Sequence, residues 1–425
     1  MSCGSPRSKA RSIQRSISGR SLIAYSSPAR CRAWRPIVAD EIHHDYLIEP
    51  IDPLVFGDGR TIGTVGVSRS RVLPPPSQLA GAVRSQAGSD PRGRWMPERR
   101  AEVLQLEIRG PLGALLDPRG EVIDWWLPRP ADAVVMEPRP DAPRVRRLVP
   151  LVLPEGCAWD LDAGPGVGMR GHDPRKPDAS ALPFWSWRRG LCPWLEGRAP
   201  GDGFGLEGPS PELRTHVALE RNGTARDGML YGVTGVRYDT AVKGGAHRSW
   251  GGGQRQHRRH ALAFSSDADL SESLIRPLGG ERRLARWRRA ELPWPGPPEA
   301  VLDSATAGAL RMYLATPGAF GQGSRPRLDG AEVVAQANGR PEIVSGWDYQ
   351  QRAPKPTRRL VPAGAVYFLR LTATDPQERL AWVASRWLRS VSDEPQAQRD
   401  GFGLALFGTW SGELEPLDLS PGGTP

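Results

Sequence analysis

Residues 375–410 constrain the fold more than any other part of the chain, because a helix pattern leads there into a strand pattern. Asp375 can accept the free amides of a helix start, and Pro376 is favourable at the first helical position. Apolar side chains then recur with helical spacing at Leu380, Val383, Ala384, Trp387 and Leu388. The stretch predicts an amphipathic helix that packs one face against a neighbouring element.

The sequence DGFGLALFGTW follows at 400–410. We expect a glycine-rich loop at Gly401, Phe402 and Gly403 that leads into a buried strand. A backbone without Cβ atoms can approach another backbone or a phosphate closely. A plain turn before a core strand explains a lone Gly-Phe-Gly as well, and DGFGL occurs again at 202–206 without a helix before it. Both interpretations stay open at this point.

Length and composition indicate a soluble α+β protein. A chain of 425 residues is long enough for two domains with separate cores, and 49 glycines and 43 prolines favour short strands and turns. No run of about 18 apolar residues is present, which excludes a transmembrane helix. The four cysteines lack CxxC spacing, which argues against a structural zinc ribbon and a disulfide framework and fits a reducing cytoplasm. We expect no cofactor and no metal.

The formal charge of +10 is concentrated at the N-terminus. Residues 1–39 contain eight arginines and lysines and no acid, which leaves +2 for the rest of the chain. Any nucleic-acid surface on the folded body is therefore expected to be a local patch. We predict that residues 1–43 form a disordered basic arm; an arm that touches nucleic acid and an organelle transit segment are the alternatives.

The first ordered part of the chain predicts a strand, a helix and two more strands. Residues 46–56 form the first strand, and a turn at 57–60 ends in Arg60. Ser77 is expected to cap a helix with Arg84 on its polar side. This order is the opening of a βαββαβ ferredoxin-like unit, not of a dinucleotide-binding sheet.

Those two further strands are predicted from different patterns. Alternation over 104–108 indicates a half-buried strand, and residues 122–127, which include Trp125 and Trp126, return as its partner after a turn. Residues 154–210 are rich in Gly and Pro and indicate a long insertion. Its tryptophans either anchor the loop against the body or stack on bases; they are Trp159, Trp185, Trp187 and Trp194.

A hairpin is predicted where Asn222-Gly223 separates strands at 213–219 and 229–238. The acid-free, basic stretch 242–260 is either a flexible finger that grips a nucleic-acid strand or a solvated loop. At 278–287, two glycines precede a basic strand, so that backbone amides, Arg282 and Arg283 are expected along one rim.

A proline-rich linker at 291–299 separates the two predicted units. The first is a ferredoxin-like domain at 44–290 that carries the insertion. The second covers 300–417, with strands at 310–314, 332–335, 342–347 and 365–371, and a short tail follows at 418–425.

Strong catalytic signatures are missing from the sequence: HExxH, GxxxxGK[ST] and GxSxG are all absent. His216, on a predicted strand beside Arg214, is the one acid–base candidate. A structural or phosphate-pairing role explains a lone histidine more simply than catalysis.

Seven segments in order resemble a known family: IDPLVFGDGR, PPPSQLAGAVR, RTHVAL, LGGERRLARW, VSGWDY, RRLVPAGAVYFL and DGFGLALFGTW. Together they are similar to the RAMP proteins of type III-B CRISPR systems, in particular the third subunit of the Cmr module. The resemblance runs from about residue 45 to residue 410. The basic arm and the stretch 242–260 lie outside it.

The resemblance implies two ferredoxin-like folds and a non-catalytic subunit of a ribonucleoprotein that acts in antiviral defence. Such subunits hold the 5′ tag of the CRISPR RNA (crRNA), and they dock with the large palm-domain subunit and neighbouring RAMP subunits. Positions in the matched segments that are expected to contact RNA are Arg60, Arg84, Arg214, His216, Arg282, Arg283, Gly401, Phe402 and Gly403. The alternatives are a RAMP-type endoribonuclease that processes precursor crRNA through His216, and the equivalent subunit of a Csm module.

Overall fold

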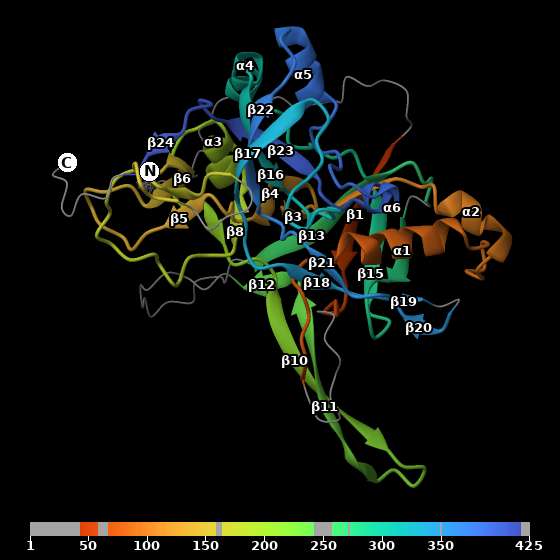
Figure 1. The fold of residues 1–425 in the computed structure, drawn as a ribbon. Coiled ribbons are helices and arrows are strands. Elements are labelled where there is room, and N and C mark those ends of the chain that lie inside the picture. Colours follow the sequence, from red (N-terminus) through yellow and green to blue (C-terminus); the bar gives the residue numbers. More distant parts are fainter. Residues whose placement is uncertain are drawn as a thin grey trace, which may run out of the picture.

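The computed structural model describes residues 43–57, 67–158, 164–241, 257–270, 273–348 and 351–417. The predictions for the basic arm before His43, for Arg60, for Trp159 and for most of the stretch 242–260 lie outside these residues. Strands outnumber helices among the described residues, and the α+β class is confirmed (Figure 1).

The largest sheet has nine strands in the order β14-β15-β1-β13-β3-β4-β8-β9, and β12 pairs with β13. Neighbouring strands in it run antiparallel. The nine strands are β1 (His44–Pro50), β3 (Ile108–Leu116), β4 (Val122–Pro128), β8 (Phe184–Ser186), β9 (Gly205–Leu206), β12 (Asp239–Ala241), β13 (His257–Ser266), β14 (Ser273–Pro277) and β15 (Leu284–Arg289). The return strand at 122–127 is confirmed. The first strand, predicted over 46–56, is confirmed only up to Pro50, because residues 51–56 form bends and isolated bridges.

Alternation along the strands of this sheet lets different parts of the chain cover its two faces. Tyr46 and Ile48 of β1 share a core with Val83 of helix α1 (Pro76–Ala87). Leu47, on the opposite face, shares a core with the C-terminal sheet, for example with Phe368. The two halves of the chain are therefore joined through one hydrophobic core.

The C-terminal sheet has four strands in the order β17-β22-β16-β23. They are β16 (Ala309–Leu314), β17 (Ala331–Ala337), β22 (Val366–Leu371) and β23 (Ala405–Thr409). Helices α4 (Glu299–Ala307) and α5 (Pro376–Ala384) lie side by side at the top of Figure 1. Their buried residues Val301 and Val383 complete the core of this sheet.

A long hairpin extends from the body at the bottom of Figure 1. It consists of β10 (Ser210–Leu219) and β11 (Ala225–Arg237), with β2 (Val67–Ser68) parallel to β11. The Asn222-Gly223 turn connects its strands, so the predicted hairpin is confirmed. The remaining elements are β5 (Ala133–Val135), β6 (Val145–Val152), β7 (Val167–Met169), β18 (Glu342–Val344), β19 (Trp347–Asp348), β20 (Ala353–Pro354), β21 (Arg358–Leu360), β24 (Glu415–Pro416), α2 (Arg100–Val103), α3 (Cys192–Leu195), α6 (Pro395–Asp400), a 3-10 turn at Pro97–Arg99 and a π-helical turn at Trp187–Leu191.

Local boundaries differ from the sequence predictions at three places. The predicted strand at 104–108 is wrong, because a helical turn (α2) precedes it and β3 begins only at Ile108. Helix α1 begins at Pro76 after a Pro75 cap, so Ser77 is not the N-cap. Helix α5 ends at Ala384, because Leu388 has a φ of 52° and its amide bonds to the carbonyl of Ala405 at 2.8 Å.

The proline-rich stretch 291–299 is held against both halves of the chain. The indole of Trp125 donates to the carbonyl of Pro293 at 3.0 Å, and that of Trp387 donates to Pro295 at 2.7 Å. Trp294 stacks on Trp125 with 4.8 Å between ring centroids. These contacts fix the connection between the two units in one position.

Candidate nucleic-acid interface

The β10–β11 hairpin carries a stacked aromatic pair on one of its faces. His216 lies directly opposite Tyr231 in the ladder, and their rings are parallel within 15° at a centroid distance of 5.4 Å. Tyr231 keeps 40% of its surface exposed. The Nε2 atom of His216 is buried and has no hydrogen-bond partner among the described residues. An exposed flat ring pair of this kind offers a stacking surface.

Arg214 lies on the same face as this pair, two residues nearer the body. Its Nε donates to Glu212 at 2.7 Å, and Arg237 pairs with the other oxygen of that carboxylate at 2.6 Å. The hydrogen bond from Arg214, aided by both positive charges, lowers the pKa of Glu212. Two guanidiniums share one carboxylate here, which leaves a net positive charge beside the aromatic pair.

The opposite face of the hairpin is apolar and exposed. Leu213, Val217 and Leu230 leave 59%, 44% and 62% of their surfaces uncovered. The register places Val217 directly across from Leu230, so these two side chains adjoin, and Leu213 lies farther along the same face, beyond Thr215. Contiguous apolar surface of this kind marks contact sites for other molecules.

Two grooves meet where the hairpin joins the large sheet. One, of about 980 Å³, is lined by Arg214, Arg237 and Asp239 among others. The second, of about 740 Å³, is lined by four arginines and two acids, namely Arg119, Arg259, Arg286, Arg288, Glu49 and Glu121. Asp239 of the first groove pairs in the ladder with Arg259 of the second. The grooves are therefore neighbours along one edge.

Glu49 organises the arginines of the second groove. Its carboxylate accepts from Arg259 at 2.6 Å and from Arg288 at 3.0 Å. Arg119 and Arg286 are exposed and pair with no acid among the described residues. This arginine groove, as we name it from here on, therefore keeps free positive charge.

The turn between β14 and β15 holds two of the predicted RNA-binding residues. Arg282 is exposed and has a φ of 50°, and Glu281 before it has a φ of 56°. The amide of Gly280 bonds to the carbonyl of Val55 at 2.7 Å, which anchors the turn. Arg283 is half-buried, and its Nε has no partner among the described residues.

Arg84 is not on a polar surface, and that prediction is wrong. Its side chain is buried, because its Nε donates to the carbonyl of Val103 and its Nη2 to that of Leu106, both at 3.0 Å. Its Nη1 pairs with Asp400 at 2.5 Å. Arg84 therefore joins helix α1 to helix α6.

The glycine-rich loop after α6 is enclosed by the chain itself. A Cβ on Gly401 would lie 2.6 Å from the carbonyl oxygens of Ile108 and Gly110, and one on Gly403 would lie 2.7 Å from the hydroxyl of Ser392. Phe402 is 1% exposed. The close approach that these glycines permit is to the protein's own backbone, so we leave the loop out of the candidate interface.

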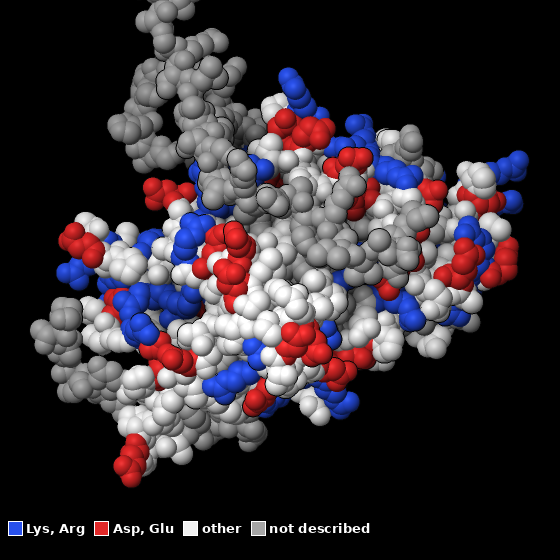
Figure 2. Space-filling view, turned by 90° about the horizontal axis from the view of Figure 1, so that it is seen from above, with Lys and Arg blue, Asp and Glu red and all other residues white. Residues whose placement is uncertain are grey.

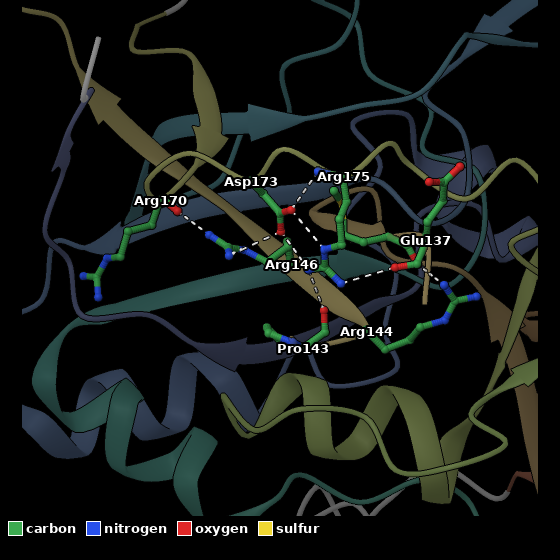
Figure 3. A network of polar contacts seen from close by, with 8 residues as sticks. Glu137, Pro143, Arg144, Arg146, Arg170, Asp173 and Arg175 are labelled. Atoms are coloured by element: carbon green, nitrogen blue, oxygen red, sulfur yellow. Dashed lines mark hydrogen bonds and ion pairs between the residues drawn. The ribbon is translucent and has the colours of Figure 1, made fainter. Parts of the chain in front are cut away.

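Arginines in and beside the insertion, namely Arg146, Arg170 and Arg175, bond to other groups of the protein itself (Figure 3). Asp173 accepts from Arg175 at 2.7 Å and pairs with Arg146 at 3.5 Å. Hydrogen bonds from Arg175 lower the pKa of Asp173 to about 2. The described tryptophans of the insertion are buried as well, which confirms the anchoring interpretation for Trp185, Trp187 and Trp194.

Charges of both signs are interspersed on the face of the molecule shown in Figure 2. Within the described ranges, no group of three or more His, Cys, Asp or Glu could hold a metal ion. No helix in the described part of the chain is long and apolar enough to cross a membrane.

The sequence analysis missed the arginine groove and the partner of His216. The groove combines residues from β1, β13, β15 and the turn after β3, and no local pattern connects these segments. Tyr231 was not accessible from the Asn222-Gly223 turn either, because the register shifts between Val217 and Leu219 and changes the partner of His216.

Comparison with protein families decides what kind of protein carries this surface. The family model of the CRISPR-associated protein Cas_Cmr3 matches residues 46–410. The chain belongs to the Cas_Cmr3 family. Membership confirms the resemblance to type III-B Cmr RAMP proteins and makes the chain a subunit of a type III CRISPR effector.

Solved structures of low similarity also match this family member. A chain of a type III-B Cmr-beta complex bound to cognate target RNA and AMPPnP has 12% identity and a TM-score of 0.40, with 76% of this chain and 86% of that chain covered. A chain of the same complex with target RNA alone has 12% sequence identity and a TM-score of 0.39, with the same coverage of both chains. A chain of the type III-A Csm3–Csm4 subcomplex has 10% sequence identity and a TM-score of 0.33, with 76% of this chain and 92% of that chain covered. No curated protein matches.

Proposed function

We propose that this protein is a non-catalytic, RNA-binding subunit of a type III-B CRISPR (Cmr) effector ribonucleoprotein that acts in antiviral defence in the cytoplasm. It holds the 5′ tag of the crRNA and docks with the large palm-domain subunit and with neighbouring RAMP subunits. Family membership supports the assignment to the effector. The geometry of the hairpin supports the RNA contact.

The observation that carries the RNA role is the His216–Tyr231 stack beside Arg214 on the extended hairpin. Single-stranded RNA is recognised by aromatic rings that stack on splayed bases and by cations that pair with phosphates. A guanidinium presents a planar fork that matches phosphate geometry. The hairpin therefore offers both kinds of contact, and Arg282 and Arg283 extend the positive surface from the β14–β15 turn.

The strand orders support two ferredoxin-like units. In each half, the first and third strands along the chain lie in the centre of a four-stranded antiparallel set, as in β15-β1-β13-β3 and β17-β22-β16-β23. This is the arrangement of a βαββαβ unit. Each half departs from it by one helix: β14 replaces the helix between β13 and β15, and a loop connects β16 to β17.

The environment of His216 supports a non-catalytic role. A general base must reach the 2′-OH proton of the RNA, within about 3 Å. The Nε2 atom of His216 is buried, His216 lines neither of the two grooves, and its ring stacks on Tyr231. We therefore assign His216 to base stacking and not to cleavage.

Binding and cleavage assays with the full-length protein and a tag-bearing RNA test this function. We expect binding without cutting. Replacement of Arg282 and Arg283 by alanine should weaken binding and reduce the slope of log K against log salt by about 1.4, since each phosphate contact on a single strand contributes about 0.7. The matched control removes two exposed arginines elsewhere, Arg139→Ala with Arg340→Ala, and should leave the slope unchanged.

Three results would contradict parts of the proposal. Metal-independent cleavage at a defined phosphate would show an endoribonuclease. An unchanged salt slope in the Arg282/Arg283 variant would remove the β14–β15 turn from the RNA site. Failure to co-purify with the large subunit would remove the docking role. Sequencing the ends of any RNA that co-purifies shows whether the protein holds the 5′ tag.

A further inference from the structure

Strand β14 leaves one edge of the nine-stranded sheet open. Among the described strands it has a single neighbour, β15. The amide of Leu278 bonds to the carbonyl of Arg283, and alternate antiparallel pairs exchange hydrogen bonds, so Leu274 and Arg276 also bond inward. The backbone groups of Ser273 and Ile275 therefore point away from the sheet. The side chain of Arg276 donates to the carbonyl of Ile275 at 3.2 Å, so this carbonyl points away from β15.

Exposed edges in soluble proteins are protected by charged side chains, prolines, bulges or a covering loop, and in β14 this protection consists of Arg276 and Pro277 at one end, with no other described strand beyond it. Pro277 protects one end, because it has no amide to donate. Ile275 in the middle leaves 48% of its surface exposed. An open edge with an exposed apolar side chain at its centre is a template for an added strand.

The arginine groove lies beside this edge, on the face toward which Ile275 points. Arg286 is directly opposite Ile275 in the ladder, and Arg288 is opposite Ser273. Side chains of such pairs lie about 4.5–5.5 Å apart at Cβ. Ser273 and Ile275 line the groove together with Arg119 and Arg259. A strand added to β14 would place every second side chain among these cations.

We infer that β14 is a docking edge for an extended, acidic segment of a partner protein. The segment pairs its backbone with Ser273 and Ile275, and its alternate Asp or Glu side chains enter the arginine groove. The charge of the groove selects acids, since Arg119 and Arg286 have no acidic partner among the described residues. The open backbone edge favours a polypeptide over RNA, because a nucleic acid cannot complete the ladder.

Hydrogen–deuterium exchange on the free full-length protein and on the reconstituted effector complex tests this directly. In the complex, the peptide that covers β14 should exchange at least about tenfold more slowly than in the free chain. Unchanged exchange would overturn the inference. Equal protection by the tag-bearing RNA alone would show that RNA, not protein, occupies the edge, and would overturn it as well.

Two pairs of variants separate backbone pairing from charge. Ile275→Pro removes the outward amide and leaves the ladder to β15 intact, so it should reduce incorporation into the complex about tenfold. Ile275→Thr keeps the amide and should assemble normally. Arg286→Glu should reduce incorporation, and Arg139→Glu, a reversal far from the groove, should not. Wild-type assembly of both Ile275→Pro and Arg286→Glu would overturn the inference. RNA binding by the free variants, measured in parallel, keeps this test distinct from that of the RNA site.

Discussion

Arg311 of β16 donates its Nη1 hydrogen bond to the carboxylate of Asp132, and both side chains are almost completely buried, at 2% and 0% exposure. The indole of Trp194 donates to the second oxygen of Asp132 at 2.8 Å. Arg311 also donates to the carbonyls of Trp194 at 2.7 Å and Thr409 at 2.8 Å. Asp132 and Arg311 are therefore paired, and Arg147 lies beside them, over the ring of Trp194 and bonded to the Trp194 carbonyl at 2.9 Å. The cluster joins the C-terminal sheet to the insertion.

Replacement of Asp132 by alanine should destabilise the protein by about 3–5 kcal/mol. The substitution leaves the guanidinium of Arg311 buried without its carboxylate, and an uncompensated buried charge costs this much. Urea unfolding of the full-length protein measures the change. Asp141→Ala removes an exposed acid and serves as the control. A loss below about 1 kcal/mol would show that water reaches Arg311.

Arg84→Met should reduce stability and leave the affinity for tag-bearing RNA unchanged. The variant removes the ion pair with Asp400 and the bonds to two carbonyls, which leaves buried acceptors unpaired. We expect a loss of about 3 kcal/mol in the free energy of unfolding. Arg214→Ala should do the opposite, because Arg214 lies on the hairpin surface. A loss of RNA affinity in a fully folded Arg84→Met protein would return Arg84 to the RNA site.

Tyr231→Ala should weaken RNA binding roughly tenfold, since one stacked base contributes about 1–3 kcal/mol. Tyr231→Phe keeps the ring and should bind like the wild type. Thr215→Ala, on the opposite face of the hairpin, is the control. Fluorescence anisotropy with a labelled single strand measures affinity. Equal affinity for Tyr231→Ala and Tyr231→Phe would exclude stacking at this site.

His260 should make the protein less stable in mild acid. Burial, with a smaller effect of Arg258, lowers the pKa of His260 from 6.5 to about 4. The unfolded chain then binds the proton first, so the stabilisation is complete above pH 6.5 and is lost as the pH falls to about 4. The pKa difference corresponds to roughly 3 kcal/mol.

The variant His260→Leu isolates this effect. The imidazole lies edge-on to Trp126 at 5.6 Å, and its Nδ1 has no partner among the described residues, so an apolar side chain fits the site. Denaturant unfolding between pH 7 and pH 4 should show a shallower fall in stability for the variant. Parallel curves for the two proteins would contradict the assignment.

Two glycine substitutions should have opposite signs. Gly401 has a φ of 88°, and a Cβ would lie 2.6 Å from two carbonyl oxygens, so Gly401→Ala should cost at least about 1–3 kcal/mol. Gly81 lies inside helix α1 with no atom near its Cβ position, and Gly81→Ala should stabilise by about 0.5–1 kcal/mol. Thermal unfolding of both variants checks the pair. A neutral Gly401→Ala would show that the loop can move away from the carbonyl oxygens of Ile108 and Gly110.

Local patterns were sufficient for elements whose partners are close in sequence. The Asn222-Gly223 turn predicted the hairpin itself. The position of His216 opposite Tyr231 depends in addition on a register shift between Val217 and Leu219, which the turn does not predict. Asp375 caps helix α5 by accepting from the amide of Gln377 at 3.0 Å, as its position before Pro376 predicted. The order of the matched segments was enough to identify the family.

Contacts between distant segments were not accessible from those patterns. Apolar periodicity indicates which side of an element is buried, but it does not identify the polar groups that lie next to that side. The sequence by itself determined the α+β class, the hairpin and the family. Only the tertiary structure decided that Arg84 meets Asp400 in the interior, because these residues are 316 positions apart in the sequence. It also decided that the arginines of the arginine groove, which come from three separate segments, gather beside the open edge of β14.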